Sequence, residues 1–361
     1  MRLFAVLLAS AAVLAAQKTP PTPPNPPDQP GGILKGPAIP GGALGMSQQL
    51  DLTGRVLLEN RQPPPEPVAV EYSCRGKTGA GLTDAKGRFS IGVGRQQVAR
   101  SSLATDLPDF SGCSVQVRVP GFEDVSVKLR RVHTLSDLNL GDVMLKSVSG
   151  KENAAFSVTA RDAPNKARGS YVRALEYLGA KQYPEAIAAL DKAVRLYPRY
   201  ATALQLKGQI LELAGEPEAA RAAYRQAIAA DPAYAKPLVQ LAEMAAADQN
   251  ATEAVRWAAM VNRLAPGAYP SMYLLEGSAE FNLGRPAEAG NAARAGIAAD
   301  RAGFYSALHR LLGEVLYQQR DYAGALEQFD RYLKDAPEAP DVEAVQSQAE
   351  SCRKLVPPPH Q

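Results

Sequence analysis

The sequence predicts a multidomain chain in which an antiparallel β-sandwich is followed by an all-α solenoid. Pro198, Pro232 and Pro266 recur at an interval of 34 residues, and a period of this length is typical of stacked helix–turn–helix units. Before them, residues 50–148 contain short runs of alternating apolar and polar residues that are separated by turn residues. This alternation predicts strands, and about a hundred such residues favour a sandwich.

Small residues in the second half keep the same interval. Ala186, Ala220 and Ala254 each lie twelve residues before one of the three prolines. A proline just after the second helix of a unit prevents that helix from continuing. Each unit is too small to enclose a core alone, so it gains stability by stacking on its neighbours.

With these positions in place, the array resembles tetratricopeptide repeats, whose pattern has Trp, Leu-Gly and Tyr in the first helix and Ala, Phe, Ala and Pro in the second. The second unit supplies Leu204, Gly208, Leu211, Ala220, Tyr224, Ala227 and Pro232, and the fifth supplies Leu312, Gly313, Leu316, Ala325, Phe329, Tyr332 and Pro337. The resemblance implies about five repeats over residues 164–338 and a capping helix over 340–356, with a short tail at 357–361. Looser spacing predicts extra loop residues around the fourth unit. An unrelated alanine-rich helical bundle is the alternative.

The N-terminal residues predict export. Residues 1–16 combine Arg2, an apolar run and the small residues Ala15 and Ala16, which is typical of a signal peptide. An uncleaved anchor is the alternative. Residues 17–49 are rich in Pro and Gly and predict a disordered linker. No later stretch is apolar enough to cross a membrane, so we expect a periplasmic, secreted or surface-associated protein without a transmembrane segment after cleavage.

Strands are expected in six places of the β region. They are Leu50–Leu58, Val68–Cys74, Arg88–Val93, Cys113–Val119, Val125–Leu129 and Gly141–Lys146. The stretches 53–56, 67–70 and 83–91 resemble the carboxypeptidase regulatory-like domain, a transthyretin-like sandwich, over residues 50–148, with a linker at 149–163. In that family the stretch that matches Thr83–Phe89 is a structural hairpin. Another seven-stranded sandwich is the alternative. A zinc peptidase needs His-x-x-Glu, whereas Thr134, Leu135 and Ser136 follow His133.

Cysteines fall on two predicted strands and on the last helix. Cys74 and Cys113 are expected to form a disulfide in an oxidising compartment. This bond would close a loop of 39 residues, which adds roughly 3–4 kcal/mol of stability in the entropy model. Two free buried thiols are the alternative, because the sequence does not show their separation. Cys352 is left over, either buried or open to intermolecular pairing.

The repeat resemblance implies a concave groove lined by the first helix of each pair. The groove-facing positions that it implies are Arg168, Tyr171, Gln205, Gln209, Glu212, Lys236, Glu243, Leu274, Phe281, Arg310, Glu314 and Tyr317. Aromatic, amide and charged residues of both signs suit an extended peptide or a partner helix. The chain has 40 basic and 37 acidic residues, and this near-balance argues against a nucleic-acid partner.

Catalytic motifs are missing from the sequence. It has no Gly-Lys-Ser/Thr phosphate loop, no Gly-x-Ser-x-Gly turn and no recognised Cys/His pair. We therefore expect no enzyme activity, no cofactor and no metal site. The preferred hypothesis is an exported, non-enzymatic scaffold that binds a protein partner in the groove. The alternative is carbohydrate or cell-wall binding by the sandwich, with the repeats as an assembly platform.

Overall fold

The computed structural model describes residues 47–97, 110–129, 138–148 and 155–356. The predicted signal peptide, the predicted linker up to residue 46, His133 and the tail 357–361 lie outside the described residues. The chain divides into two compact units, one within Pro23–Asp231 and the other within Pro232–Gln361. The first unit contains all described strands together with the first helices.

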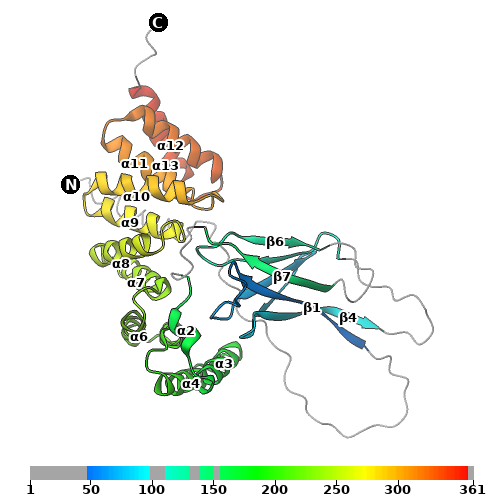
Figure 1. Ribbon diagram of the computed structural model, residues 1–361. Coiled ribbons are helices and arrows are strands. Elements are labelled where there is room, and N and C mark those ends of the chain that lie inside the picture. Colours follow the sequence, from blue (N-terminus) through cyan, green and yellow to red (C-terminus); the bar gives the residue numbers. More distant parts are fainter. Residues whose placement is uncertain (1–46, 98–109, 130–137, 149–154, 357–361) are drawn as a thin grey trace, which may run out of the picture. The chain divides into compact units, whose positions relative to one another are not determined.

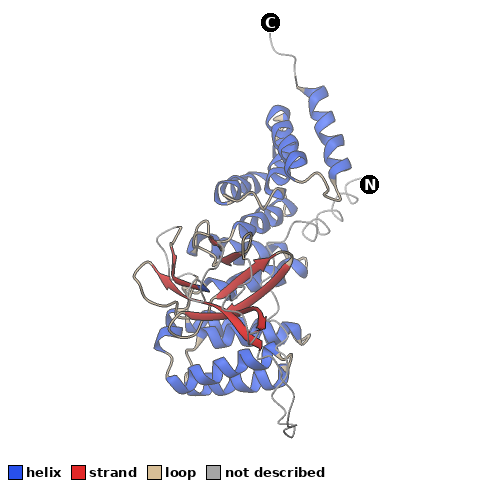
Figure 2. Cartoon of the chain, turned by 90° about the vertical axis from the view of Figure 1, so that its right-hand side faces the viewer, coloured by secondary structure: helices blue, strands red, loops and turns tan. Residues whose placement is uncertain are grey.

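Strands occupy only the N-terminal part of the described chain (Figure 1; Figure 2). They are β1 (Ser47–Leu58), β2 (Ala69–Cys74), β3 (Lys77–Leu82), β4 (Arg88–Gln97), β5 (Ser114–Val117), β6 (Val125–Lys128) and β7 (Asn139–Leu145). One sheet has the order β4-β1-β7 and the other the order β3-β2-β5-β6. All six expected strands form, and β3 is an additional one.

A single apolar core joins the two sheets. Leu52 of β1, Ile91 of β4, Val70 of β2 and Val117 of β5 all belong to it, and each is almost completely buried. The alternation of buried and exposed residues along these strands produces this core. The prediction of a β-rich N-terminal region is thus confirmed. The expectation of a purely antiparallel arrangement is wrong, because β1 pairs with β7 in parallel.

The additional strand β3 follows β2 through a tight turn. Arg75 and Gly76 both have positive φ, 49° and 80°, the backbone geometry of a two-residue hairpin turn. A Cβ atom at Gly81 would lie 3.0 Å from Cγ1 of Ile91, so glycine allows β3 to pack closely on β4. Its two glycines, Gly79 and Gly81, have weak strand propensity, which explains why the sequence pattern did not reveal this strand.

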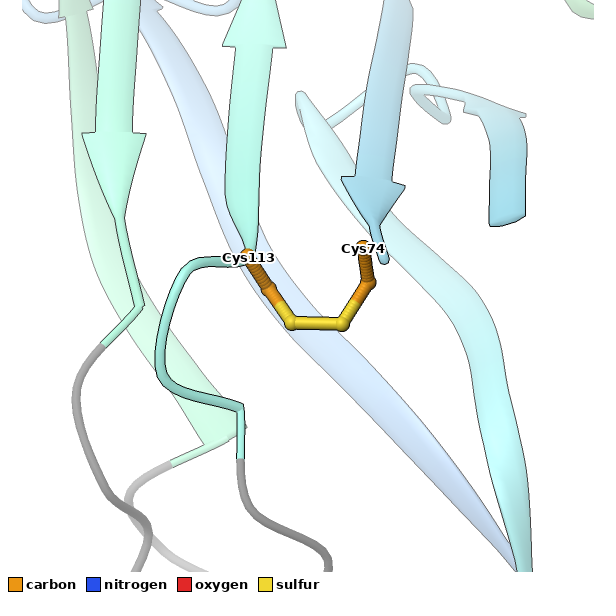
Figure 3. The surroundings of a disulfide bond; sticks show 2 residues. All are labelled: Cys74 and Cys113. Atoms are coloured by element: carbon orange, nitrogen blue, oxygen red, sulfur yellow. A yellow bond between two sulfur atoms is a disulfide. The ribbon is translucent and has the colours of Figure 1, made fainter. Parts of the chain in front are cut away.

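The disulfide pair links neighbouring strands of the second sheet. Cys74 ends β2, and Cys113 immediately precedes β5, its antiparallel neighbour. Their Cα atoms are 4.2 Å apart, and the two residues form a disulfide (Figure 3). The third cysteine, Cys352, is a buried free thiol, and burial raises its pKa.

Twelve helices follow in the described chain (Figure 1). They are α2 (Val158–Asp162), α3 (Asn165–Gly179), α4 (Tyr183–Leu196), α5 (Ala201–Leu213), α6 (Pro217–Ala230), α7 (Ala235–Ala247), α8 (Ala251–Leu264), α9 (Pro270–Asn282), α10 (Pro286–Ala299), α11 (Ala307–Gln318), α12 (Tyr322–Asp335) and α13 (Val342–Leu355). From α3 to α12 they pack as pairs of consecutive helices. The second helices α4, α6 and α10 have proline in their first turn, where it costs no hydrogen bond.

The repeated alanines lie in the cores of these helix pairs. Each is at most 1% exposed, from the first pair to the last: Ala186, Ala220, Ala254, Ala289 and Ala325. The looser spacing of the fourth unit corresponds to a loop of residues 300–306, longer than the loop 231–234 between earlier units. Helix α13 lies where the capping helix was expected. Among the described helices, none is both long and apolar enough to span a membrane.

Candidate protein-binding surface

All twelve predicted groove residues lie on the first helix of a pair. Helices α3 and α5 carry those of the first unit, and α7, α9 and α11 carry those of the second. Their accessibility differs from one helix to the next.

On α3, Tyr171 is only 8% exposed. Its ring centroid lies 5.5 Å from that of Tyr200. Burial, reinforced by the nearby Glu66 carboxylate, raises the pKa of both phenols. Arg168 is half-buried and donates a hydrogen bond to Asn165 at 2.8 Å. A side chain as buried as Tyr171 offers almost no surface to a partner, which corrects the expectation for this residue.

On α5, burial increases toward the start of the helix. Gln205 is 5% exposed, which likewise corrects its predicted place in an open groove. Gln209 and Glu212 lie on the same face one and two turns later and are half-buried. Glu212 accepts a hydrogen bond from the hydroxyl of Tyr224. This face of α5 is therefore closed at one end and partly open at the other.

A cluster of buried polar side chains covers the closed end. It consists of Glu66, Ser157, Thr159, Thr202 and Asp231, each at most 5% exposed. One oxygen of Glu66 accepts hydrogen bonds from the Ser157 amide at 2.7 Å and from the Thr202 hydroxyl at 3.1 Å. Thr202 lies one turn before Gln205 on the same face of α5. The loop that precedes β2 thus reaches the predicted binding face of the repeats.

The remaining members of the cluster hold α2 in place. The Ser157 hydroxyl and the Val158 amide donate to Oδ2 of Asp231 at 2.7 and 3.0 Å. The hydroxyl of Thr159 accepts from the amide of Ala201 at 3.1 Å. The sequence pattern assigns these residues no role. Their partners are distant in the chain, so no local pattern marks them.

In the compact unit within Pro232–Gln361, helix α7 presents an accessible polar surface. Glu243 is exposed and accepts a hydrogen bond from Gln240 at 2.9 Å. The ammonium group of Lys236 lies 5.7 Å from the ring centroid of Tyr234, close enough for a cation–π contact. Both predicted residues of α7 thus remain accessible on the described surface.

The two predicted residues of α9 differ in accessibility. Leu274 is 5% exposed and packs with Leu308 and Leu311 in an apolar core. It is therefore a core residue, which corrects its assignment to the groove. Phe281 packs against the same cluster and is half-buried, so part of its ring remains available.

On α11, Arg310 and Glu314 form an internal ion-pair network. Nη1 of Arg310 lies 2.8 Å from Glu314, and its Nε lies 3.3 Å from Asp341, which immediately precedes α13. Asp341 also accepts a hydrogen bond from the hydroxyl of Tyr332. Burial raises the pKa of Glu314, and Asp341 raises it further, whereas Arg310 lowers it. Arg310 and Glu314 are thus paired within this unit, and Tyr317, at 36% exposed, is the most accessible of the three predicted residues of this helix.

Among the described residues of the β region, no aromatic ring is exposed for stacking on a sugar. Its four aromatic residues, Tyr72, Phe89, Phe110 and Phe122, are all at most 6% exposed. A shallow hollow of about 430 Å³ lies beside Arg55, Arg88 and Asp142. Arg55 and Asp142 are joined there by two hydrogen bonds of 2.9 Å. Within the described chain, no group of three or more His, Cys, Asp or Glu side chains is placed to hold a metal ion.

Comparison with known proteins identifies the helical part. The family model of the tetratricopeptide repeat matches residues 171–235 and 274–340. No curated protein matches the chain. Similar solved structures include the MamA protein (16% identity, TM-score 0.42, 48% of this chain and 93% of that chain), Pseudomonas aeruginosa pilF (20%, 0.39, 52% and 89%) and YrrB, described as a TPR protein with an unusual peptide-binding site (18%, 0.43, 52% and 92%). The matched stretches and the helix pairs confirm tetratricopeptide repeats at residues 171–235 and 274–340.

Proposed function

We propose that this protein is a non-enzymatic adaptor that binds a protein or peptide partner through the first helices of its tetratricopeptide repeats. The observation that carries the proposal is the repeat match over both halves of the helical array. Arrays of this kind present side chains from successive first helices to one extended ligand.

The compact unit within Pro232–Gln361 is the better candidate for the binding surface. Four of the predicted residues there are exposed or half-buried and lie outside the ion pair of Arg310 and Glu314: Lys236, Glu243, Phe281 and Tyr317. They combine a cation, an anion and two aromatic rings. Such a mixture favours a peptide with both apolar and charged side chains, since aromatic residues contribute most of the affinity and charges set the register.

Site-specific photo-crosslinking tests this function. A photo-reactive phenylalanine analogue is placed at Glu243 or Tyr317 in the full-length chain, and at Glu327, an exposed residue of the second helix α12, as a control. After irradiation in the native cells, we expect the first two positions to yield the same discrete protein adduct. Identical adducts from Glu327, or none from any position, would contradict the proposal.

We further propose that the chain is exported and that residues 50–148 form a carboxypeptidase regulatory-like sandwich. Residues 1–16, with their apolar run and small residues, support export. The single core shared by two sheets and the turn at Asp84–Gly87 support the sandwich. N-terminal sequencing of the protein recovered from its cells tests export. A first residue of Gln17 is expected, whereas an intact Met1 in a cytoplasmic fraction would contradict it.

A further inference from the structure

The segment Ala155–Ala163, here called the strap, connects the β region with the first repeat and is anchored at both ends. Phe156 belongs to the β core and lies 5.6 Å, centroid to centroid, from Phe122. At the other end, Ala160 and Ala163 belong to the core of the first helices. Two apolar anchors thus fix the short helix α2 between the β region and the first two repeats.

Between these anchors, hydrogen bonds join the strap both to the repeats and to the β region. The backbone amide of Ser157 donates to Glu66, and its hydroxyl donates to Asp231. Glu66 in turn accepts from Thr202 on α5. Because all of these groups are almost fully buried, each bond would be costly to break without a replacement.

This contact lies on the same face as the predicted partner-binding residues of the first unit. Thr202 and Gln205 are one helical turn apart on α5, and the Glu66 carboxylate is close enough to Tyr171 and Tyr200 to raise the pKa of both phenols. The loop before β2, which carries Glu66 in the run Pro63-Pro64-Pro65-Glu66-Pro67, therefore occupies this face together with the strap.

We propose that Glu66 and the strap are a built-in ligand of the face formed by α3 and α5, and that a partner reaches Tyr171 and Gln205 only after this contact opens. The assignment of that face to partner binding rests on the proposed function. While this contact is formed, a partner can bind only to the compact unit within Pro232–Gln361.

Thiol labelling of the full-length chain tests whether the face opens. The reporter is Gln205→Cys, and its labelling by a maleimide is followed by peptide-resolved mass spectrometry. Cys74 and Cys113 are protected as a disulfide, while the buried Cys352 serves as an internal reference for global unfolding. A second reporter, Gln209→Cys, lies one turn later on the half-buried part of the same face and should react readily in every background.

Glu66→Ala and Thr202→Val remove the contact from its two sides, and Glu59→Ala, which replaces an exposed acid in the same loop, is the matched control. We expect either of the first two changes to raise the labelling rate of Gln205→Cys by at least about tenfold, because the buried hydrogen bond between the Glu66 carboxylate and Thr202 is lost. Glu59→Ala should leave this rate unchanged.

An unchanged labelling rate at Gln205→Cys in both Glu66→Ala and Thr202→Val would overturn the inference. An equal increase at Cys352 would do so too, because it would show that the contact only stabilises the fold. The assay needs no partner. A negative result therefore leaves the adaptor function standing, and the absence of a crosslinked partner leaves the closed contact standing.

Discussion

A Cβ atom built on Gly208 of α5 would lie only 2.4 Å from Cε1 of Tyr224 on α6. The tyrosine is completely buried, and its ring fills the space that a larger residue at position 208 would need. The fifth repeat has the same relationship, because a Cβ atom at Gly313 would lie 2.6 Å from Cε1 of Phe329. Glycine on the first helix is thus matched to a large aromatic ring on the second.

We expect Gly208→Val to lower the free energy of unfolding by about 1–3 kcal/mol, the usual cost of overpacking a core. Gly169→Ala is the matched control. Gly169 also lies within a helix, but nothing surrounds its missing Cβ, so this change should stabilise the chain by about 0.5–1 kcal/mol through helix propensity. Chemical denaturation measures both. Equal effects of the two changes would show that the ring does not constrain position 208.

The first repeat suggests a rescue of this defect. There Ala174 and Leu190 stand 34 residues before Gly208 and Tyr224, and both are completely buried. The double change Gly208→Ala with Tyr224→Leu copies that pair. The loss of unfolding free energy in the double variant should be smaller than the sum of the losses in the two single variants, and a double-mutant cycle measures this difference. Additive single effects would mean that the two positions are independent.

The turn between the two helices of a repeat places one residue in the left-handed region. Gly215 and Gly284 occupy it with φ of 79° and 74°, whereas Lys181, Gln249 and Arg320 have φ of 58°, 59° and 66°. A side chain in this conformation costs roughly 1 kcal/mol or more. We therefore expect Lys181→Gly or Gln249→Gly to stabilise the chain and Gly215→Lys to destabilise it, each by about 1 kcal/mol.

Thermal and denaturant unfolding of these variants check the prediction. Replacement of the residue just before the turn, Ala180→Gly, is the control, because Ala180 has an ordinary negative φ of −85°. Glycine gains nothing there, and stabilisation by Ala180→Gly would contradict the explanation.

Removal of the Cys74–Cys113 disulfide should weaken the β region. The bond closes a loop with a sequence separation of 39, so we expect the double change to alanine to lower its free energy of unfolding by roughly 3–4 kcal/mol in the entropy model. Denaturation of the oxidised and reduced chain measures the difference. Added reductant should not change the free energy of unfolding of the double variant. A decrease of roughly 3–4 kcal/mol there would show that the effect of the reductant comes from Cys352 and not from the disulfide.

Glu314 should make the second unit less stable as the pH rises. Burial raises its pKa in the folded chain above the usual value of 4.5. Between 4.5 and the raised value, the folded chain binds more protons than the unfolded chain, so stability falls as the pH rises through this window and then levels off. The stability gain of Glu314→Gln over the original chain should therefore grow across the same window.

Denaturant midpoints measured from about pH 2 to pH 8 test this. Asp142 offers a contrast, because its hydrogen bonds to Arg55 lower its pKa below the usual value of 3.8. For Asp142→Asn the stability loss should grow as the pH rises toward 3.8 and stay constant above it, in a lower pH range than the Glu314 effect and with the opposite sign. A pH-independent difference for Glu314→Gln would contradict the assignment.

The interval of 34 residues was sufficient to predict the helical array. Its prolines and the buried alanines, such as Ala186 and Ala220, report contacts within one unit and its neighbour, and these contacts recur at fixed chain spacing. The strands could also be predicted, because alternation is a local property. The strand β3 could not, since Gly79 and Gly81 carry no alternation.

The accessibility of the predicted groove residues could be foreseen only in part. All of them lie on first helices of the repeats, but Leu274 packs with Leu308 and Leu311 of the next repeat. A helical pattern shows that one face is apolar and another polar, yet it does not show which neighbour covers a residue near the boundary between them.

By itself, the sequence determined the repeat unit, its helix pairs and the existence of a β-rich region, because each depends on residues a few positions or one period apart. Only the tertiary structure decided that Glu66 meets Thr202, a residue 136 positions away. It thereby decided which part of the repeat surface is closed. A contact between residues so far apart in the sequence occurs only once. It is not repeated at a fixed interval, so the sequence contains no pattern from which it could be predicted.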